Sequence, residues 1–190
     1  MGDPPGFSVM AAMCRGRGIG YKNKLSWWQY PLKGDYDYYM DWTSRVTSPD
    51  KYCVNIMGRK TWETTGEEER NRKHVFNIVI SRDTGKTLKK DPHVHKIISS
   101  FDDAVRFSLS TENREQFESV WILGGEKVYE EAVQHPLCRR IFLTEIMEHF
   151  QSDTFFPQFE EEKFEKTSES DVHEENGIRY VFKVYSRKSE

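Results

Sequence analysis

Residues that could hold phosphate groups follow an apolar run late in the chain. The run at residues 120–123 ends at Gly124-Gly125, and Val128 and Ala132 then keep the spacing of a helix. A buried strand that enters a helix through two glycines leaves backbone N–H groups and the positive end of a helix dipole in one crevice, where phosphates bind. A tight turn without a ligand is the alternative interpretation of a glycine pair alone.

Two further predicted strands end in residues suited to anions. These residues are Gly58, Arg59, Lys60, Thr61, Ser81 and Arg82. Cations at the start of a helix are disfavoured unless an anion joins them. Strand ends of an open parallel sheet meet at the edge where ligands bind, so three such ends predict several phosphates, as in a dinucleotide. Arg59 and Arg82 could clamp a 2′-phosphate, which favours NADPH over NADH.

A carboxylate next to aromatic residues is the second candidate for chemistry. Asp35 heads a predicted helix whose same face carries Tyr36 and Tyr39. The acid could pair with the amidine-like edge of a planar nitrogen heterocycle while the rings pack beside it. The alternative is that Asp35 only caps the helix, since Asp is a preferred N-cap residue.

Common nucleotide-binding and hydrolase motifs are absent from the sequence. Gly16, Gly18 and Gly20 lack the spacing of the dinucleotide fingerprint, and no P-loop occurs. There is no nucleophile elbow and no zinc-protease motif. His93 and His95 are too few for a metal site, so we expect no metal.

Strand-like runs alternate with helical patterns along the chain. The predicted strands span residues 7–13, 53–57, 75–81, 120–123, 141–147, 164–167 and 178–185, and the predicted helices begin near residues 35, 101 and 126. This order predicts an α/β fold with a mostly parallel sheet, helices on both faces and an antiparallel C-terminal edge. We expect a flexible loop at residues 16–20, charged surface at residues 67–74, and a single domain over residues 1–190.

Composition narrows the class of protein. The 190 residues include 28 basic and 31 acidic ones, for a net charge of −3, so a nucleic-acid partner is not favoured. Three cysteines indicate a reducing compartment. The N-terminus lacks the features of a signal peptide, and no apolar stretch reaches membrane-spanning length. We therefore expect a cytoplasmic protein without a membrane partner.

Taken together, the motifs resemble those of animal dihydrofolate reductases over nearly the whole chain. The matching motifs are Met10-Ala11-Ala12, Gly18-Ile19-Gly20, Leu25-Ser26-Trp27, Asp35, Met57-Gly58-Arg59-Lys60-Thr61-Trp62, Ser81-Arg82, Trp121-Ile122-Leu123-Gly124-Gly125 with Tyr129, Leu143-Thr144 and Asp153-Thr154-Phe155-Phe156-Pro157. The resemblance implies a three-layer fold with a mixed eight-stranded sheet flanked by helices. It also implies hydride transfer from NADPH to 7,8-dihydrofolate.

The resemblance assigns roles to individual residues. Asp35 would anchor the pterin with help from Thr144, and Leu25 and Trp27 would belong to a loop that closes over the nicotinamide. The implied substrate contacts are Met10, Ala11, Ala12, Asp35, Tyr36, Tyr39, Thr64, Arg72, Leu123, Tyr129 and Thr144. The implied cofactor contacts are Ala12, Gly18, Ile19, Gly20, Gly58, Arg59, Lys60, Thr61, Ser81, Arg82, Gly124, Gly125, Glu126, Lys127, Val128 and Tyr129.

The sequence departs from the family pattern in three places. Residues 28–30 lengthen the segment after Trp27 by about two residues. Val75 stands where the family usually has an Arg that binds the glutamate tail of the substrate, and we expect Arg72 or a neighbouring cation to replace it. Glu126 replaces a common small residue near the pyrophosphate, and we expect its side chain to point away.

Two other functions remain open at this point. One is a same-fold reductase of pyrimidine intermediates in riboflavin synthesis, which the aromatic helix after Asp35 disfavours. The other is a non-catalytic nucleotide- or RNA-binding protein that kept the fold. By resemblance, the partners would be dihydrofolate and antifolate inhibitors, the chain a monomer, and RNA binding no more than a secondary activity.

Overall fold

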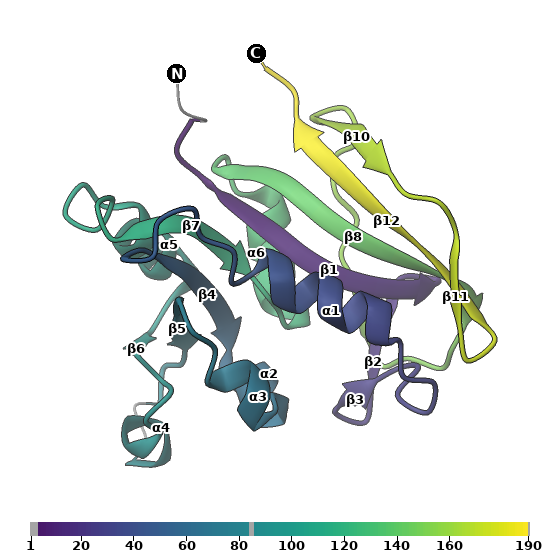
Figure 1. The fold of residues 1–190 in the computed structure, drawn as a ribbon, viewed down its shortest axis with the longest axis horizontal. Coiled ribbons are helices and arrows are strands. Elements are labelled where there is room, and N and C mark those ends of the chain that lie inside the picture. Colours follow the sequence, from purple (N-terminus) through teal and green to yellow (C-terminus); the bar gives the residue numbers. More distant parts are fainter. Residues whose placement is uncertain (1–3, 84–85, 190) are drawn as a thin grey trace.

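The computed structural model describes residues 4–83 and 86–189, and a large mixed sheet forms its centre (Figure 1). The strand order is β10-β12-β8-β1-β7-β4-β5-β6, with β11 paired to β12. The strands are β1 (Phe7–Arg15), β4 (Tyr52–Gly58), β5 (Val75–Ile80), β6 (Lys96–Ile98), β7 (Phe117–Ile122), β8 (Cys138–His149), β10 (Phe164–Glu169), β11 (His173–Glu175) and β12 (Ile178–Arg187). The helices are α1 (Lys33–Trp42), α2 (Arg59–Thr64), α3 (Glu67–Arg70), α4 (Lys86–Lys90), α5 (Phe101–Leu109) and α6 (Glu126–Gln134).

The pairing of the strands confirms the predicted α/β architecture. Strands β8, β1, β7, β4, β5 and β6 are joined in parallel pairs, whereas β12 runs antiparallel to β8 and β10. Asn176 and Gly177 turn the chain from β11 into β12, and both have the positive φ that a type I′ turn requires. The C-terminal edge is therefore an antiparallel hairpin, as predicted.

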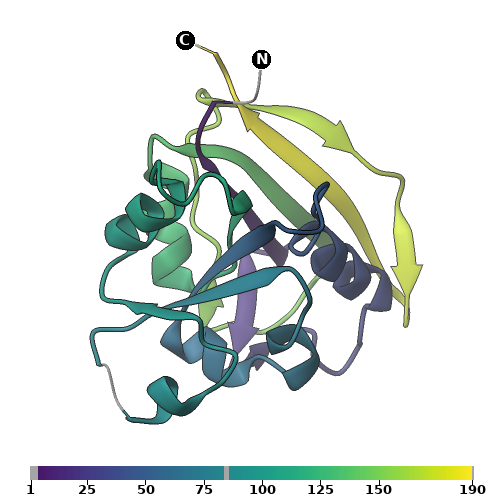
Figure 2. The same ribbon diagram turned by 60° about the vertical axis from the view of Figure 1, so that its left-hand side comes forward.

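Helices cover both faces of the sheet (Figure 2). On one face, α5 and α6 pack against the central strands through residues such as Ala104 and Ala132, which are fully buried. On the other face, α1 and α2 contribute Trp42 and Trp62 to a second apolar cluster. Because the central strands are covered on both sides, their residues form continuous apolar runs rather than an alternating pattern.

A small second sheet corrects the expectation of a flexible loop at residues 16–20. Strand β2 (Gly18–Tyr21) pairs with β3 (Lys24–Leu25) and with β9 (Thr154–Phe155). The turn before β2 is also fixed, because the Arg17 guanidinium donates to the carbonyl oxygens of Phe156, at 3.0 Å, and Pro157. Strand β9 and the partners of Arg17 lie more than 130 residues further along the chain, so local sequence patterns could not reveal that they fix this segment.

Helix α1 begins two residues before the predicted start. Its first residue is Lys33 and its N-cap is Leu32, so Asp35 lies within the first turn and is not the cap. The backbone N–H groups of Lys33 and Gly34 are instead bonded by Glu175 of β11. A cap supplied by a distant strand allowed the helix to start earlier than its own residues indicated.

Candidate active site

The predicted phosphate-binding strand ends lie side by side. Strands β4 and β7 are joined at their carboxyl ends, where the Gly58 N–H donates to the Gly124 carbonyl at 2.8 Å. Strand β5 neighbours β4 and leads into Ser81. The three motifs separated in sequence therefore meet at one edge of the sheet.

The glycine pair leaves space for an anion at the start of α6. A Cβ at Gly125 would lie 3.0 Å from the Thr61 hydroxyl oxygen, and one at Gly124, whose φ is +114°, would lie 3.0 Å from the Tyr129 ring. At Gly125, therefore, only backbone atoms of the α6 N-terminus face the Thr61 hydroxyl. Since Gly125 is the N-cap and has no side chain, it leaves the first N–H groups of α6 uncapped, which suits a phosphate.

Cationic side chains gather beside this glycine pair. The Arg59 guanidinium donates to Glu63 at 2.8 Å and to Asp83 at 3.0 Å, so it reaches the segment after β5. The Ser81 hydroxyl is buried and donates to the Asp83 carbonyl, whereas Lys60 and Arg82 are exposed. A 2′-phosphate at this place would compete with the two carboxylates for Arg59.

The side chain of Glu126 is engaged by the small sheet. Its Oε1 accepts a hydrogen bond from the Phe155 N–H of β9 at 3.1 Å. The neighbouring Lys127 is exposed, while Val128 and Tyr129 are buried under the sheet. Glu126 is therefore directed toward β9, in line with the expectation that it turns away from the glycine pair.

Asp35 meets Thr144 of β8, which pairs with Ala12 of β1, while Val9 of the same strand pairs with Ile122, two residues before the glycine pair. The Thr144 hydroxyl, on the buried middle of β8, forms a hydrogen bond with the partly buried Asp35 carboxyl. Burial raises the pKa of Asp35 to about 6, the Thr144 bond opposes this shift, and the nearby Glu175 charge adds to it. A carboxyl with such a pKa exchanges protons near neutral pH.

Tyr129 connects the glycine pair with β1. Its hydroxyl donates to the Met10 carbonyl at 2.8 Å, and burial raises its pKa, so it stays a neutral donor. Met10 and Leu123 follow Val9 and Ile122, which are paired between β1 and β7. Of the neighbouring alanines, Ala11 is buried and Ala12 is partly buried. Because a carbonyl oxygen has two lone pairs, the Met10 carbonyl can still accept a second bond.

The aromatic residues of α1 are linked to α3, which corrects the prediction of a merely charged surface at residues 67–74. The Tyr39 hydroxyl is hydrogen bonded to Glu69, and the Tyr36 hydroxyl lies 3.5 Å from the Glu68 carboxylate. The Arg72 guanidinium lies 5.3 Å from the centre of the Tyr39 ring. No local signal in the sequence distinguished the partly buried Glu69 from its exposed neighbours Glu67 and Glu68.

Arg72 is held in place by α1. It donates to the Thr43 hydroxyl at 2.6 Å and to the Met40 carbonyl at 3.2 Å. Its Nε donates to the Glu69 carbonyl at 3.0 Å. Thr64 is exposed, and its hydroxyl donates to the Thr61 carbonyl at 2.9 Å.

Comparison with known proteins decides the family. The sequence profile described as dihydrofolate reductase matches residues 6–187. The dihydrofolate reductase of Sus scrofa is 39% identical over 96% of this chain and 98% of its own length. Those of Mus musculus and Gallus gallus are each 38% identical, over 95% and 94% of this chain and 97% and 94% of their own lengths. The chain belongs to the dihydrofolate reductase family. This membership decides against the riboflavin-pathway reductase.

One cation near Val75 is placed to replace the arginine that the dihydrofolate reductase pattern has at this position. Val75 itself is buried and apolar. Arg70 is committed elsewhere, because it donates to the Asp91 carboxylate at 3.2 Å and to the Trp62 carbonyl at 2.6 Å. Lys73 is exposed, and only Arg72 of these three cations contacts the ring of Tyr39.

The loop that closes over the nicotinamide in this family is anchored at both ends here. Leu25 is 55% exposed, whereas Trp27 is buried in a cluster with Leu32 and Tyr180. Gly18 and Gly20 lie so close to Ser152 and Thr154 that a Cβ at either position would collide with these side chains. Ile19 packs against the main core. The loop segment thus depends on contact with residues 152–155.

The inserted residues 28–30 stay at the surface. Trp28 is 50% exposed and Tyr30 is 41% exposed. The Lys24 ammonium lies 4.0 Å from the centre of the Trp28 ring, and the Tyr30 ring packs against Phe150. The insertion therefore extends the side of the loop without adding to the buried core.

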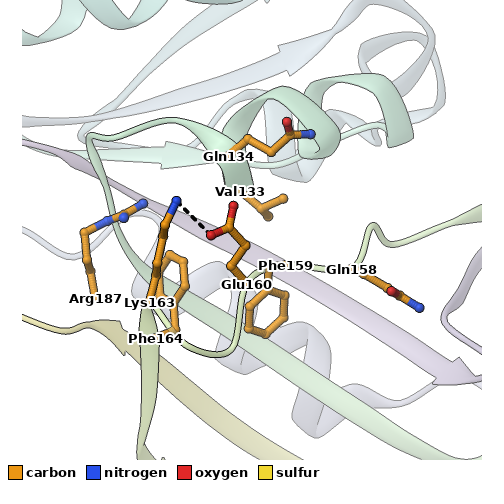
Figure 3. A pocket seen from close by; sticks show the side chains of 8 residues that line it. All are labelled: Val133, Gln134, Gln158, Phe159, Glu160, Lys163, Phe164 and Arg187. Atoms are coloured by element: carbon orange, nitrogen blue, oxygen red, sulfur yellow. Dashed lines mark ion pairs between the residues drawn. The ribbon is translucent and has the colours of Figure 1, made fainter.

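Two cavities lie outside the candidate active site. One has a volume of about 300 Å³ and lies between α6, the start of β10 and the end of β12 (Figure 3). Two of its charges, Lys163 and Glu160, form an ion pair at 2.7 Å. The other, of about 320 Å³, includes Arg17 and Glu145. None of the predicted site residues lines either cavity.

The part of the chain that the structure describes has neither a metal-binding cluster nor a membrane-spanning helix. Among residues 4–83 and 86–189, no group of three or more His, Cys, Asp or Glu side chains is arranged to hold a metal ion. No helix in the same ranges is long and apolar enough to cross a bilayer.

Proposed function

We propose that this chain reduces 7,8-dihydrofolate to 5,6,7,8-tetrahydrofolate with NADPH. The reaction would supply tetrahydrofolate for one-carbon metabolism and for thymidylate, purine and glycine synthesis. The observation that carries the proposal is the Asp35–Thr144 pair, since only β1 lies between its strand β8 and the strand β7 that leads to the glycine pair. Membership of the dihydrofolate reductase family supports it.

In this proposal Asp35 binds the pterin and helps its protonation. The carboxylate accepts hydrogen bonds from the amidine-like edge of the ring and stabilises the cationic form, while Thr144 orients it. A water molecule delivers the proton to N5, since Asp35 in this family is too distant to donate directly. The carbonyls of Met10 and Leu123 accept from the exocyclic amine, with Tyr129 and Ala11 behind them.

The residues at the glycine pair have the chemistry that NADPH requires. Gly124, Gly125 and Thr61 offer backbone and hydroxyl donors to the pyrophosphate, and a Cβ on Gly125 would fill the space beside Thr61. Arg59, Lys60, Ser81 and Arg82 would hold the adenosine phosphate, and Ala12, Ile19 and Gly20 the nicotinamide end. When bound, NADPH supplies the hydride. Leu25 and Trp27 exclude bulk water from the reacting rings.

We also propose a cytoplasmic monomer with a single domain over residues 1–190. Cys14, Cys53 and Cys138 are buried and free, as expected in a reducing compartment. One continuous sheet, with strands from both ends of the chain, supports the single domain. Dihydrofolate and antifolate inhibitors are the expected ligands.

The assay that tests the proposed function follows NADPH absorbance at 340 nm. The purified protein should oxidise NADPH when dihydrofolate is added and should be inactive with either compound alone. A protein that folds cooperatively but gives no absorbance change with both ligands saturating would favour the non-catalytic binding alternative.

Arg59→Ala tests the expected preference for the 2′-phosphate. Loss of a charge-assisted bond to phosphate should raise the KM for NADPH roughly tenfold or more, because such bonds contribute about 1.5–3 kcal/mol. The KM for NADH should change little. Arg106→Ala removes a more exposed arginine of α5, which is also ion-paired, and serves as the control. Equal losses for the two cofactors would contradict a role in binding the 2′-phosphate.

A further inference from the structure

The helix that carries Asp35 is capped by a carboxylate from the C-terminal hairpin. The N–H groups of Lys33 and Gly34 donate to the two carboxylate oxygens of Glu175, at 3.0 and 2.7 Å. Leu32, the N-cap residue, has no side chain that could accept these bonds. A negative charge at this end of α1 is also favoured by the helix dipole.

Two further hydrogen bonds and one close approach fix the hairpin against the start of α1. The Tyr180 hydroxyl, which is almost fully buried, donates to Glu175 at 2.5 Å. The side chain of Asn176 donates to the Pro31 carbonyl at 2.6 Å. A Cβ at Gly34 would collide with the Tyr180 hydroxyl, so only glycine allows this close approach. The hairpin and the helix start therefore form one fitted contact.

Glu175 remains ionised while Asp35 titrates. Partial burial alone would raise the pKa of Glu175, but the hydrogen bonds from Tyr180, Gly34 and Lys33 outweigh it and hold the pKa below its ordinary value. The pKa of Asp35, in contrast, is raised to about 6, mainly by burial. Near neutral pH the two carboxyl groups thus differ in their readiness to accept a proton.

The surroundings of Asp35 contain few charges. The groups that face it are Thr144 of β8, Tyr38 of its own helix, Tyr129 of α6, Tyr180 of β12 and Glu175 of β11. Burial raises the pKa of each of the three tyrosines, so these are neutral at physiological pH. Among these groups, Glu175 is the one that bears a charge.

We propose that Glu175 is a positioning residue for Asp35. Its carboxylate fixes the start of α1 so that Asp35 meets Thr144, and its charge disfavours the ionised form of Asp35. The effect of Glu175 on catalysis rests on the proposed reductase function. Its effect on the position and the titration of Asp35 does not, since Glu175 acts on Asp35 in the protein without ligands.

Glu175→Gln separates the charge from the shape of the side chain. In the protein without ligands, the Asp35 carboxyl is followed by NMR during a pH titration, with Asp35→Asn identifying its signal. We expect the midpoint to fall by roughly half to one pH unit in Glu175→Gln. The pH profile of kcat/KM should shift in the same direction. Glu174→Gln makes the same change at the exposed neighbouring residue and should leave both midpoints unchanged.

Tyr180→Phe distinguishes the loss of the Glu175 charge from a loosening of the start of α1. It removes one bond to Glu175 but keeps the carboxylate, so the Asp35 midpoint should not fall. If Glu175→Gln does not fold, Gly34→Ala tests the same contact, because the added Cβ forces Glu175 and Tyr180 away from α1. We expect the Asp35 midpoint to fall there as well.

Two results would overturn the inference. One is an Asp35 midpoint that is the same in Glu175→Gln and in the unmodified protein. The other is a loss of kcat/KM that is equal at every pH, which would reduce Glu175 to a structural cap. Because the titration needs neither NADPH nor dihydrofolate, a chain without reductase activity would still give this answer.

Discussion

Asp35→Asn is expected to lower turnover at pH 7 by roughly a hundredfold or more, and by much less at pH 5. A general acid–base group of this kind contributes about 10²–10⁴ in rate. At neutral pH the carboxylate stabilises the protonated pterin, whereas at acidic pH the solvent protonates the substrate without this help. Initial rates between pH 5 and 8 test the difference.

A matched control for this substitution lies two residues away. Asp37 is exposed and pairs with Lys33 on the same helix, so Asp37→Asn should leave the pH profile unchanged. If Asp35→Asn instead lost the same factor of activity at every pH, Asp35 would have no part in protonation. It would then act in binding alone.

The same substitution should stabilise the protein without ligands at neutral pH. The pKa of Asp35 is raised from 3.8 to about 6, so the folded state binds its proton more tightly than the unfolded state. Stability from this group is therefore present below pH 4 and is lost as the pH rises through 6. Asn removes a penalty on the order of 2–3 kcal/mol at pH 7. A higher melting temperature for the less active variant would show that lost activity is not lost folding.

Arg72→Ala is expected to weaken the binding of folates roughly tenfold to a hundredfold. This range corresponds to the loss of a charge-assisted bond, worth about 1.5–3 kcal/mol, between the guanidinium and the α-carboxylate of the glutamate tail. Inhibitors without a tail should bind almost as before. Equilibrium titrations with both ligand classes measure the difference.

Because Arg72 also contacts α1, the effect of Arg72→Ala on tailed ligands must be compared with its effect on tail-less ligands. Because Arg72 also donates to Thr43 and Met40, its removal disturbs the helix that carries Asp35. A disturbance of that kind would weaken tailed and tail-less ligands by the same factor. Lys73→Ala removes the adjacent exposed cation and should change neither affinity.

The sequence was sufficient to predict the elements that depend on local periodicity. Helix α5 begins at Phe101, where its start was predicted, since Ala104, Val105 and Leu109 mark one apolar face. The strands before the glycine pair and before Gly58 were also identified, because a strand buried on both faces leaves a continuous apolar run. The meeting of the three candidate motifs was predicted as well, since parallel strands bring their carboxyl ends together.

Contacts between distant segments could not be predicted in this way. Strand β2 exists because β9 pairs with it, and α1 begins at Lys33 because Glu175 bonds its first N–H groups. The bond between Glu69 and Tyr39 likewise depends on how α3 lies against α1. None of these partners shares a helix turn or a strand with its counterpart. The periodicity of the sequence therefore could not predict these contacts.

The hydrogen bond from Tyr129 to the Met10 carbonyl has a mechanical consequence. It spans from the second turn of α6 to the middle of the central strand β1, and both of its ends are buried. A helix tethered in this way cannot slide along its axis without breaking the bond. The distance between the glycine turn at one end of the tether and the strand carbonyls at the other is therefore nearly constant. The Tyr129 side chain therefore sets the distance between the proposed binding sites for NADPH and for the pterin.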